Sequence, residues 1–147
     1  MFADFLNRLI QPQPQRLSGA DANLALATLL VRVARADGHY DASEAERILS
    51  VLRDRYDLDE TAGLELRNQA EVLEAEAPDT VRFTRAIKEA VPYVDRTDVI
   101  EGLWSVVLSD GHRDHSEDTF LRLVANLLGV SDLDSALARQ RVAQNLS

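Results

Sequence analysis

The chain has 147 residues, with 16 Lys and Arg against 25 Asp and Glu, a formal net charge of −9 and no cysteine. A chain of this length usually forms one domain and can bury a sizeable hydrophobic core. The lack of cysteine excludes disulfides, thiolate nucleophiles and cysteine-ligated metal sites. The acidic balance argues against nucleic acid, and against an anionic membrane surface as the main partner, because both are bound through clustered Lys and Arg.

Hydropathy along the chain predicts no transmembrane segment. A spanning helix needs about 20 consecutive apolar residues, whereas the longest apolar run, Leu24 to Val31, is followed by Arg32. The segment from Met1 to Ile10 has neither a basic leader nor a small-residue cleavage site, which a secretory signal would carry. We therefore expect a cytoplasmic protein.

The first 18 residues differ in character from the rest. Apolar residues over Phe2–Ile10 recur with helical spacing and predict a short amphipathic helix. A stiff Gln/Pro connector follows at residues 11–15, so the expected division is residues 1–18 and a helical domain over 19–147. So short a helix is marginal alone and must pack on something. The alternatives are that this helix packs on its own domain, in a groove of a partner or on a membrane surface.

Beyond the connector, apolar residues with a period near 3.6 predict helices throughout, and sustained strand alternation is absent. Asp79 is expected to cap one helix, which Pro92 ends, and Gly129 is expected to end another. The predicted helical segments are Asp21–Ala36, Ala42–Tyr56, Glu60–Ala77, the segment between Asp79 and Pro92, Val99–Leu108, Glu117–Leu128 and Leu133–Leu146. The fold class is all-α, a compact bundle of about seven to eight helices.

An internal repeat stands out in this pattern. Residues 37–44 read DGHYDASE and residues 110–117 read DGHRDHSE, so six of eight positions are identical at an offset of 73. The flanking apolar positions agree as well, since Leu30 aligns with Leu103 and Ile48 with Leu121. Each copy therefore lies between two apolar-periodic segments, which predicts two pseudo-symmetric helix–turn–helix units.

Helix capping explains much of the motif. Gly38 can close the preceding helix, Asp41 can cap the next one, and Glu44 stands at the third helical position of a capping-box-like pair. Asp37 is not explained in this way, because a carboxylate at a helix C-terminus opposes the helix dipole. A divalent cation is one source of compensating charge, and neighbouring basic residues are another.

The cation alternative defines a candidate metal site. Three carboxylates per turn suit Ca²⁺, Mg²⁺ or Mn²⁺, and a nitrogen from His39 or His112 would favour a transition metal such as Zn²⁺. The interpretation that we favour for these histidines and for His115 is that they are exposed polar residues of the turns. The spacing does not match an EF-hand loop. The candidate metal ligands are Asp37, Asp41, Glu44, Asp110, Asp114 and Glu117.

The duplicated Asp-Gly-x-x-Asp-x-x-Glu turns resemble the TerB-like domain of tellurite-resistance proteins, which also occurs at the N-terminus of DnaJ-like membrane co-chaperones. The resemblance runs from about Leu24 to Arg141. It implies an all-α bundle with an acidic metal site at the six positions above and no enzymatic activity. It also implies a role in stress-related protein assembly with other proteins, near the cytoplasmic face of the inner membrane.

Two other functions stay open from the residues. In a purely structural adaptor both turns would be capping devices without metal. In a metal-dependent hydrolase the carboxylates would hold a cation that activates water, although no separate base or pocket signature accompanies them. Trp104 is expected in the core because its neighbours are apolar at helical spacing. The acidic segment 71–76 is expected to be a solvated helix face or a docking surface for a basic partner.

Overall fold

The computed structural model describes residues 19–36, 40–77, 79–109 and 115–146. Within these ranges the chain forms seven α-helices and no strand, which confirms the all-α prediction. The predicted helix over Phe2–Ile10 and the Gln/Pro connector lie outside the described residues. The helices are α2 (Gly19–Arg35), α3 (Ala42–Tyr56), α4 (Glu60–Glu76), α5 (Thr80–Ala90), α6 (Tyr93–Ser109), α7 (His115–Leu127) and α8 (Asp132–Leu146).

Aspartate side chains set the starts of three consecutive helices. Oδ1 of Asp41, Asp59 and Asp79 accepts a hydrogen bond from the backbone N–H three residues later, at 2.9, 2.7 and 3.0 Å. The two caps predicted at Asp41 and Asp79 are therefore present. Gly129, with φ of 73°, follows α7 as predicted, because a positive φ there suits a residue without Cβ. The predicted ends agree with the structure to within a few residues, apart from the start of α6.

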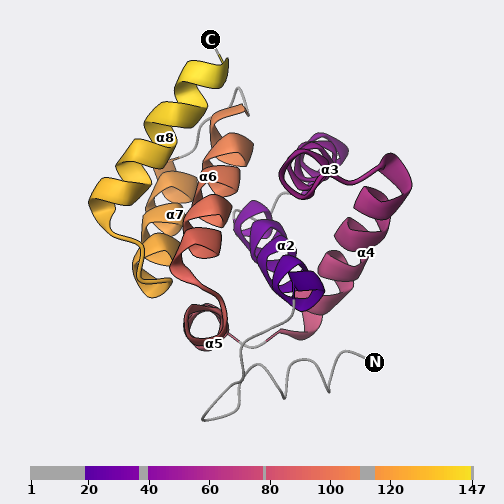
Figure 1. The fold of residues 1–147 in the computed structure, drawn as a ribbon, viewed down its shortest axis with the longest axis horizontal. Helices are drawn as coiled ribbons and strands as arrows, with labels where there is room; N and C mark the ends of the chain where they lie inside the picture. The colour runs from indigo at the N-terminus through magenta and orange to yellow at the C-terminus, as the bar shows by residue number, and fades with distance from the viewer. Residues whose placement is uncertain (1–18, 37–39, 78, 110–114, 147) are drawn as a thin grey trace.

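The helices form two sets of three, joined at the base of the molecule by α5 (Figure 1). One set contains α2, α3 and α4, and the other contains α6, α7 and α8. When 73 is added to the first residue of each helix in the first set, the result lies within two residues of the start of its counterpart in the second set. In both sets the first and third helices are in extensive contact, and α2 meets α6 between the sets. The residues that the same offset would pair with α5, 7–17, lie outside the described part of the chain.

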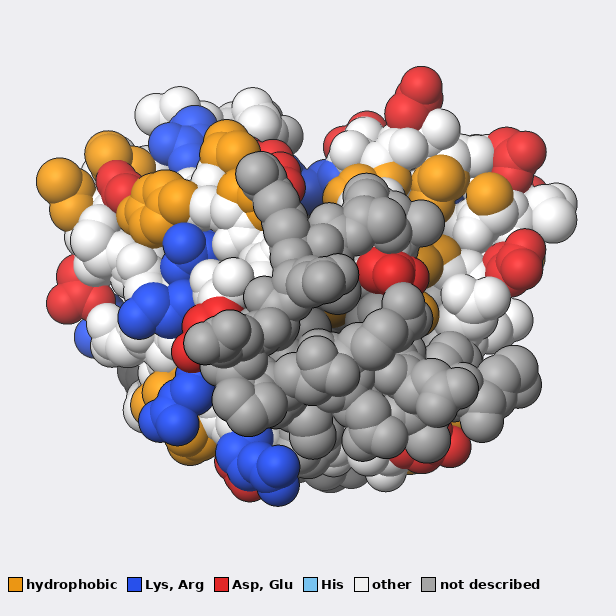
Figure 2. Space-filling view, turned by 60° about the horizontal axis from the view of Figure 1, so that its bottom comes forward, with side chains coloured by type: hydrophobic (Ala, Val, Ile, Leu, Met, Phe, Trp, Pro, Cys, Tyr) orange, Lys and Arg blue, Asp and Glu red, His pale blue; other side chains and the backbone are white. Residues whose placement is uncertain are grey.

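Charge is divided between the two sets on the face shown in Figure 2. Lys and Arg side chains gather on the left of that view, on the side of the molecule that carries α5 to α8. Asp and Glu side chains predominate on the right, on the side of α3 and α4. Cationic side chains are therefore concentrated on one side of this face, although the chain has a net charge of −9.

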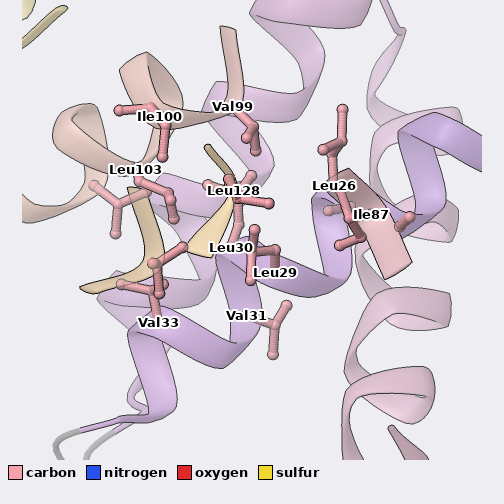
Figure 3. Close-up of a cluster of buried hydrophobic side chains, with 14 of the residues drawn as sticks. Leu26, Leu29, Leu30, Val31, Val33, Ile87, Val99, Ile100, Leu103 and Leu128 are labelled. Atoms are coloured by element: carbon pink, nitrogen blue, oxygen red, sulfur yellow. The ribbon is translucent and has the colours of Figure 1, made fainter. Parts of the chain in front are cut away.

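The core is centred on α2, which contacts α3, α4, α5, α6 and α7. Every residue from Ala25 to Val31 is buried, so this helix is enclosed rather than one-sided. Figure 3 shows α2 side chains facing Ile87 of α5, Leu103 of α6 and Leu128, which follows α7. Each large side chain buried in this way contributes about 1.5–3 kcal/mol to folding.

One polar side chain on α2 is fully buried without cost to the packing. The Thr28 hydroxyl donates to the backbone oxygen of Leu24 at 2.7 Å, one turn earlier.

None of the helices in the described ranges has both the length and the apolar character needed to cross a membrane.

Candidate cation site at the first acidic turn

The six predicted ligands are described to different extents. Asp41 and Glu44 lie in described residues with their side chains, at the start of α3. Asp37, Asp110 and Asp114 lie outside the described residues, and Glu117 is on α7 with only its backbone described. Across the described part of the chain, no three Asp, Glu, His or Cys side chains gather where they could hold a metal ion. The geometry therefore bears on two of the three carboxylates of the first turn.

Asp41 and Glu44 are positioned by the N-terminus of α3. Asp41 has extended backbone angles (φ −94°, ψ 178°), and its Oδ1 accepts the Glu44 backbone N–H at 2.9 Å. This bond restrains the Asp41 carboxylate, which lies at the surface, while Glu44 is only 8% exposed. A carboxylate has about four lone-pair sites, so an N-cap can also bind a cation. The donor chemistry of this pair fits a hard divalent ion.

Tyr40 attaches the same turn to α4. Its hydroxyl donates to Glu71 Oε2 at 2.7 Å, and the Arg35 guanidinium lies over its ring at 4.9 Å. Burial raises the pKa of the Tyr40 hydroxyl, and the hydrogen bond and negative charge of Glu71 raise it further. The phenol therefore stays protonated and donating throughout the neutral range. Tyr40 is one of the two positions at which the repeated motifs differ, the other copy having Arg113.

Glu74 is the centre of an ion-pair cluster between α2 and α4. Its two oxygens accept from Arg32 at 3.1 Å and from Arg35 at 2.9 Å, and its side chain is 13% exposed. Arg32 also lies 5.8 Å from the centroid of the Phe83 ring. The prediction of a solvated acidic face is therefore wrong for Glu71 and Glu74, because arginines of α2 and Tyr40 cover them. It is confirmed for Glu76, which is exposed.

Arg67 brings a third guanidinium to the start of α3. Its Nη1 donates to the backbone oxygen of Ala45 at 3.1 Å, although the residues are 22 positions apart. Its Nε is buried and has no hydrogen-bond partner among the described atoms. The sequence left two sources of compensating positive charge open, a divalent cation and neighbouring basic residues. The structure shows that basic side chains are present near the first turn. Helical spacing alone could not reveal this cluster, since its members come from α2 and α4, which are not consecutive in the chain.

Trp104 is in the core, as predicted, with 3% of its surface exposed. Its indole Nε1 donates to the Ser135 hydroxyl at 3.2 Å, which joins α6 to α8. The Arg139 guanidinium lies 5.5 Å from the centroid of its ring. Sequence periodicity predicted the burial of Trp104 but gave no signal for these two polar neighbours.

These observations define a class of protein: an all-helical bundle with carboxylates at the turn between its first two described helices. The family model described as tellurite resistance protein TerB matches residues 23–140. This match covers most of the chain, and the protein belongs to the TerB family. No curated protein and no solved structure matches the chain significantly.

Proposed function

We propose that this TerB-family protein is a non-enzymatic cytoplasmic module that binds a divalent cation at its acidic turns and acts in stress-related protein assembly. The observation that supports it best is the capped start of α3, where one hydrogen bond restrains Asp41 beside the buried Glu44. Asp37 precedes them in the same turn, and Asp110, Asp114 and Glu117 repeat the arrangement in sequence.

The neighbouring helix also favours a cation at the first turn. α2 ends at Arg35, two residues before Asp37, so the negative end of its dipole points toward the turn. The ligands would be the three carboxylates, which supply hard oxygen donors and no soft ligand. The cation would join α2 to α3 by neutralising carboxylates that otherwise repel one another. Arg67, which donates to the Ala45 backbone oxygen in the first turn of α3, is the competing source of positive charge.

The test is a calorimetric titration and a thermal melt of the full chain with Ca²⁺, Mg²⁺, Mn²⁺ and Zn²⁺ separately. At a cation concentration 100 times Kd, binding to the folded state alone adds about 2.7 kcal/mol to the free energy of unfolding. We expect Tm to rise with at least one ion, and the rise to shrink in Asp41→Asn and Asp110→Asn.

Asp59→Asn and Asp79→Asn are matched controls, because both residues cap helices with the geometry of Asp41 but lie outside the motif. They should change the starting Tm only slightly, because asparagine caps a helix about as well as aspartate, and should leave the cation-induced rise unchanged. If no ion produces heat or a rise in Tm, the cation proposal is wrong. Turnover of phosphoester or peptide substrates that is lost in Asp110→Asn would contradict the non-enzymatic role.

A structural adaptor without metal is the second candidate, and one observation favours it. Asp41 makes the same cap as Asp59 and Asp79, so helix capping alone accounts for its position. In that case Asp37→Asn leaves stability nearly unchanged with or without cation, whereas Asp41→Ala costs about 1 kcal/mol. A cation-dependent loss of stability in Asp37→Asn favours the cation module instead.

The assembly role is tested in cells. We expect expression of the wild-type chain to protect a tellurite-sensitive bacterial strain, and the Asp41→Asn/Asp110→Asn double variant to protect it less at equal protein level. Equal protection by both would contradict a role for the acidic turns in the stress response.

A further inference from the structure

A groove runs between α7 and α8 in the second helix set. Its volume is about 610 Å³, and Trp104 of α6 contributes to its lining. Arg122 of α7 and Arg139 of α8 also line it, together with Asn126, Ser135 and Gln140 and the acidic Asp132. The groove therefore combines a tryptophan, several polar groups and an excess of positive charge.

The first helix set has apolar residues at the corresponding positions, and the pocket that Leu49 lines there is smaller, about 510 Å³. The positions 73 residues before Arg122 and Arg139 are Leu49 and Leu66. Leu49 is buried and Leu66 packs partly buried against the core, so α3 and α4 meet through apolar contacts. Gly63 permits this close approach, since a Cβ at that position would lie 2.9 Å from Leu49 Cδ1.

The two sets therefore share an arrangement of helices. They differ in the side chains between the second and third helix of each set, which are α3 and α4 in the first set and α7 and α8 in the second. Two leucines in the first set are replaced by two arginines in the second, and Val31 by Trp104. Replacing apolar packing with guanidinium groups sacrifices burial that would stabilise the fold. Such a loss is typical of a surface that serves binding.

The two arginines are available for a ligand. Among the described residues, neither Arg122 nor Arg139 forms an ion pair. Arg141, two residues after Arg139 on α8, is by contrast paired with Glu101 at 3.3 Å. The stack on Trp104 restrains the Arg139 guanidinium, so less side-chain entropy is lost when a carboxylate binds it.

We propose that the groove between α7 and α8 binds an acidic segment of a partner protein, whose carboxylates pair with Arg122 and Arg139. Guanidinium groups bind carboxylates through two parallel hydrogen bonds, which is why arginine is favoured in such recognition. A volume of about 610 Å³ is far larger than a single small oxyanion requires, and it suits several side chains of an extended peptide. The amides of Asn126 and Gln140 can bond its backbone.

This surface would serve the assembly role proposed above, but it does not involve the acidic turns. Its test needs no added cation, so either proposal can fail while the other stands. At physiological ionic strength the screening length is about 8 Å, so distant carboxylates of the chain repel an acidic peptide only weakly.

Trp104 is the single tryptophan of the chain, so its fluorescence reports on the groove directly. We would titrate the full chain with short poly-L-glutamate, following tryptophan emission and binding heat, and repeat the titration with poly-L-glutamine and inorganic phosphate. We expect saturable binding of poly-L-glutamate only. Arg122→Gln and Arg139→Gln should each weaken it at least about tenfold, the loss typical of a hydrogen-bonded charge.

Arg85→Gln is the matched control, because Arg85 is exposed on α5 and the change in net charge is the same. Its affinity should stay within about twofold of wild type. The double variant Arg122→Leu/Arg139→Leu, which restores the residues of the first set, should abolish binding while the protein stays folded. Equal weakening by Arg85→Gln would show non-specific charge attraction and overturn the proposal. Binding of phosphate in place of poly-L-glutamate would overturn it in favour of a small-anion site.

Discussion

Several single residues in this protein form hydrogen bonds or ion pairs that link one helix to another part of the chain. Glu74 accepts from Arg32 and Arg35, while Tyr40 donates to Glu71, and both contacts attach α4 to the preceding part of the chain. A partly buried carboxylate between two arginines contributes more to the free energy of unfolding than an exposed ion pair does, because removing it leaves two guanidinium groups poorly solvated. The first acidic turn is therefore held by charges that the motif itself does not contain.

Glu74→Gln should lower the free energy of unfolding by about 1–3 kcal/mol, because Arg32 and Arg35 lose their carboxylate in a partly buried place. Chemical denaturation of the variant and wild type measures the difference. Glu76→Gln is the control, since Glu76 is exposed near the end of the same helix and should change stability by less than about 0.5 kcal/mol. Equal losses in the two variants would contradict the role given to the cluster.

At the scale of helices, the sequence predicted order and boundaries well, because aspartate caps and Gly129 mark the ends locally. Two of the candidate ligands, Asp41 and Glu44, were also placed correctly at a capped helix start. The Arg32–Arg35–Glu74 cluster could not be predicted, since it depends on how α2 crosses α4. The groove was equally hidden, because Arg122 and Arg139 are unremarkable until the spacing of α7 and α8 is known.

Gly63→Ala tests the close packing of α3 on α4. Alanine favours a helix over glycine by about 1 kcal/mol, but its Cβ would lie 2.7 Å from Arg53 Cγ and 2.9 Å from Leu49 Cδ1. Because overpacking costs about 1–3 kcal/mol, we expect a net loss of stability. The measurement is thermal denaturation beside Ala136→Gly at the matching position of α8, which should lose only helix propensity. A higher Tm for Gly63→Ala would show that the side chains of Leu49 and Arg53 can move aside without cost.

The described helices share a hydrophobic core, and two partly buried tyrosines at its edge govern the response of the protein to alkali. Burial raises the pKa of Tyr56 to about 12, and the pKa of Tyr40 is raised as well. In the unfolded chain both phenols ionise near 10. The folded state therefore binds more protons than the unfolded state above this pH, so stability falls as pH rises.

Stability should accordingly be constant below about pH 9 with respect to these groups and should decrease between about pH 10 and 12. The two-unit difference for Tyr56 corresponds to a loss of up to about 2–3 kcal/mol. Denaturation at a series of pH values, with tyrosinate absorbance recorded in parallel, measures the effect. Tyr56→Phe should flatten the decline, whereas an unchanged slope in that variant would assign alkaline sensitivity to other groups.

The enclosed position of α2 has a consequence for how the protein can be divided. Because α2 contacts helices of both sets, its apolar surface cannot be shielded by α3 and α4 alone. A fragment ending before α5 would expose to water the flank that α6 normally covers. The two helix sets are thus not independent folding units, and truncation within either set removes part of the core that the described helices share.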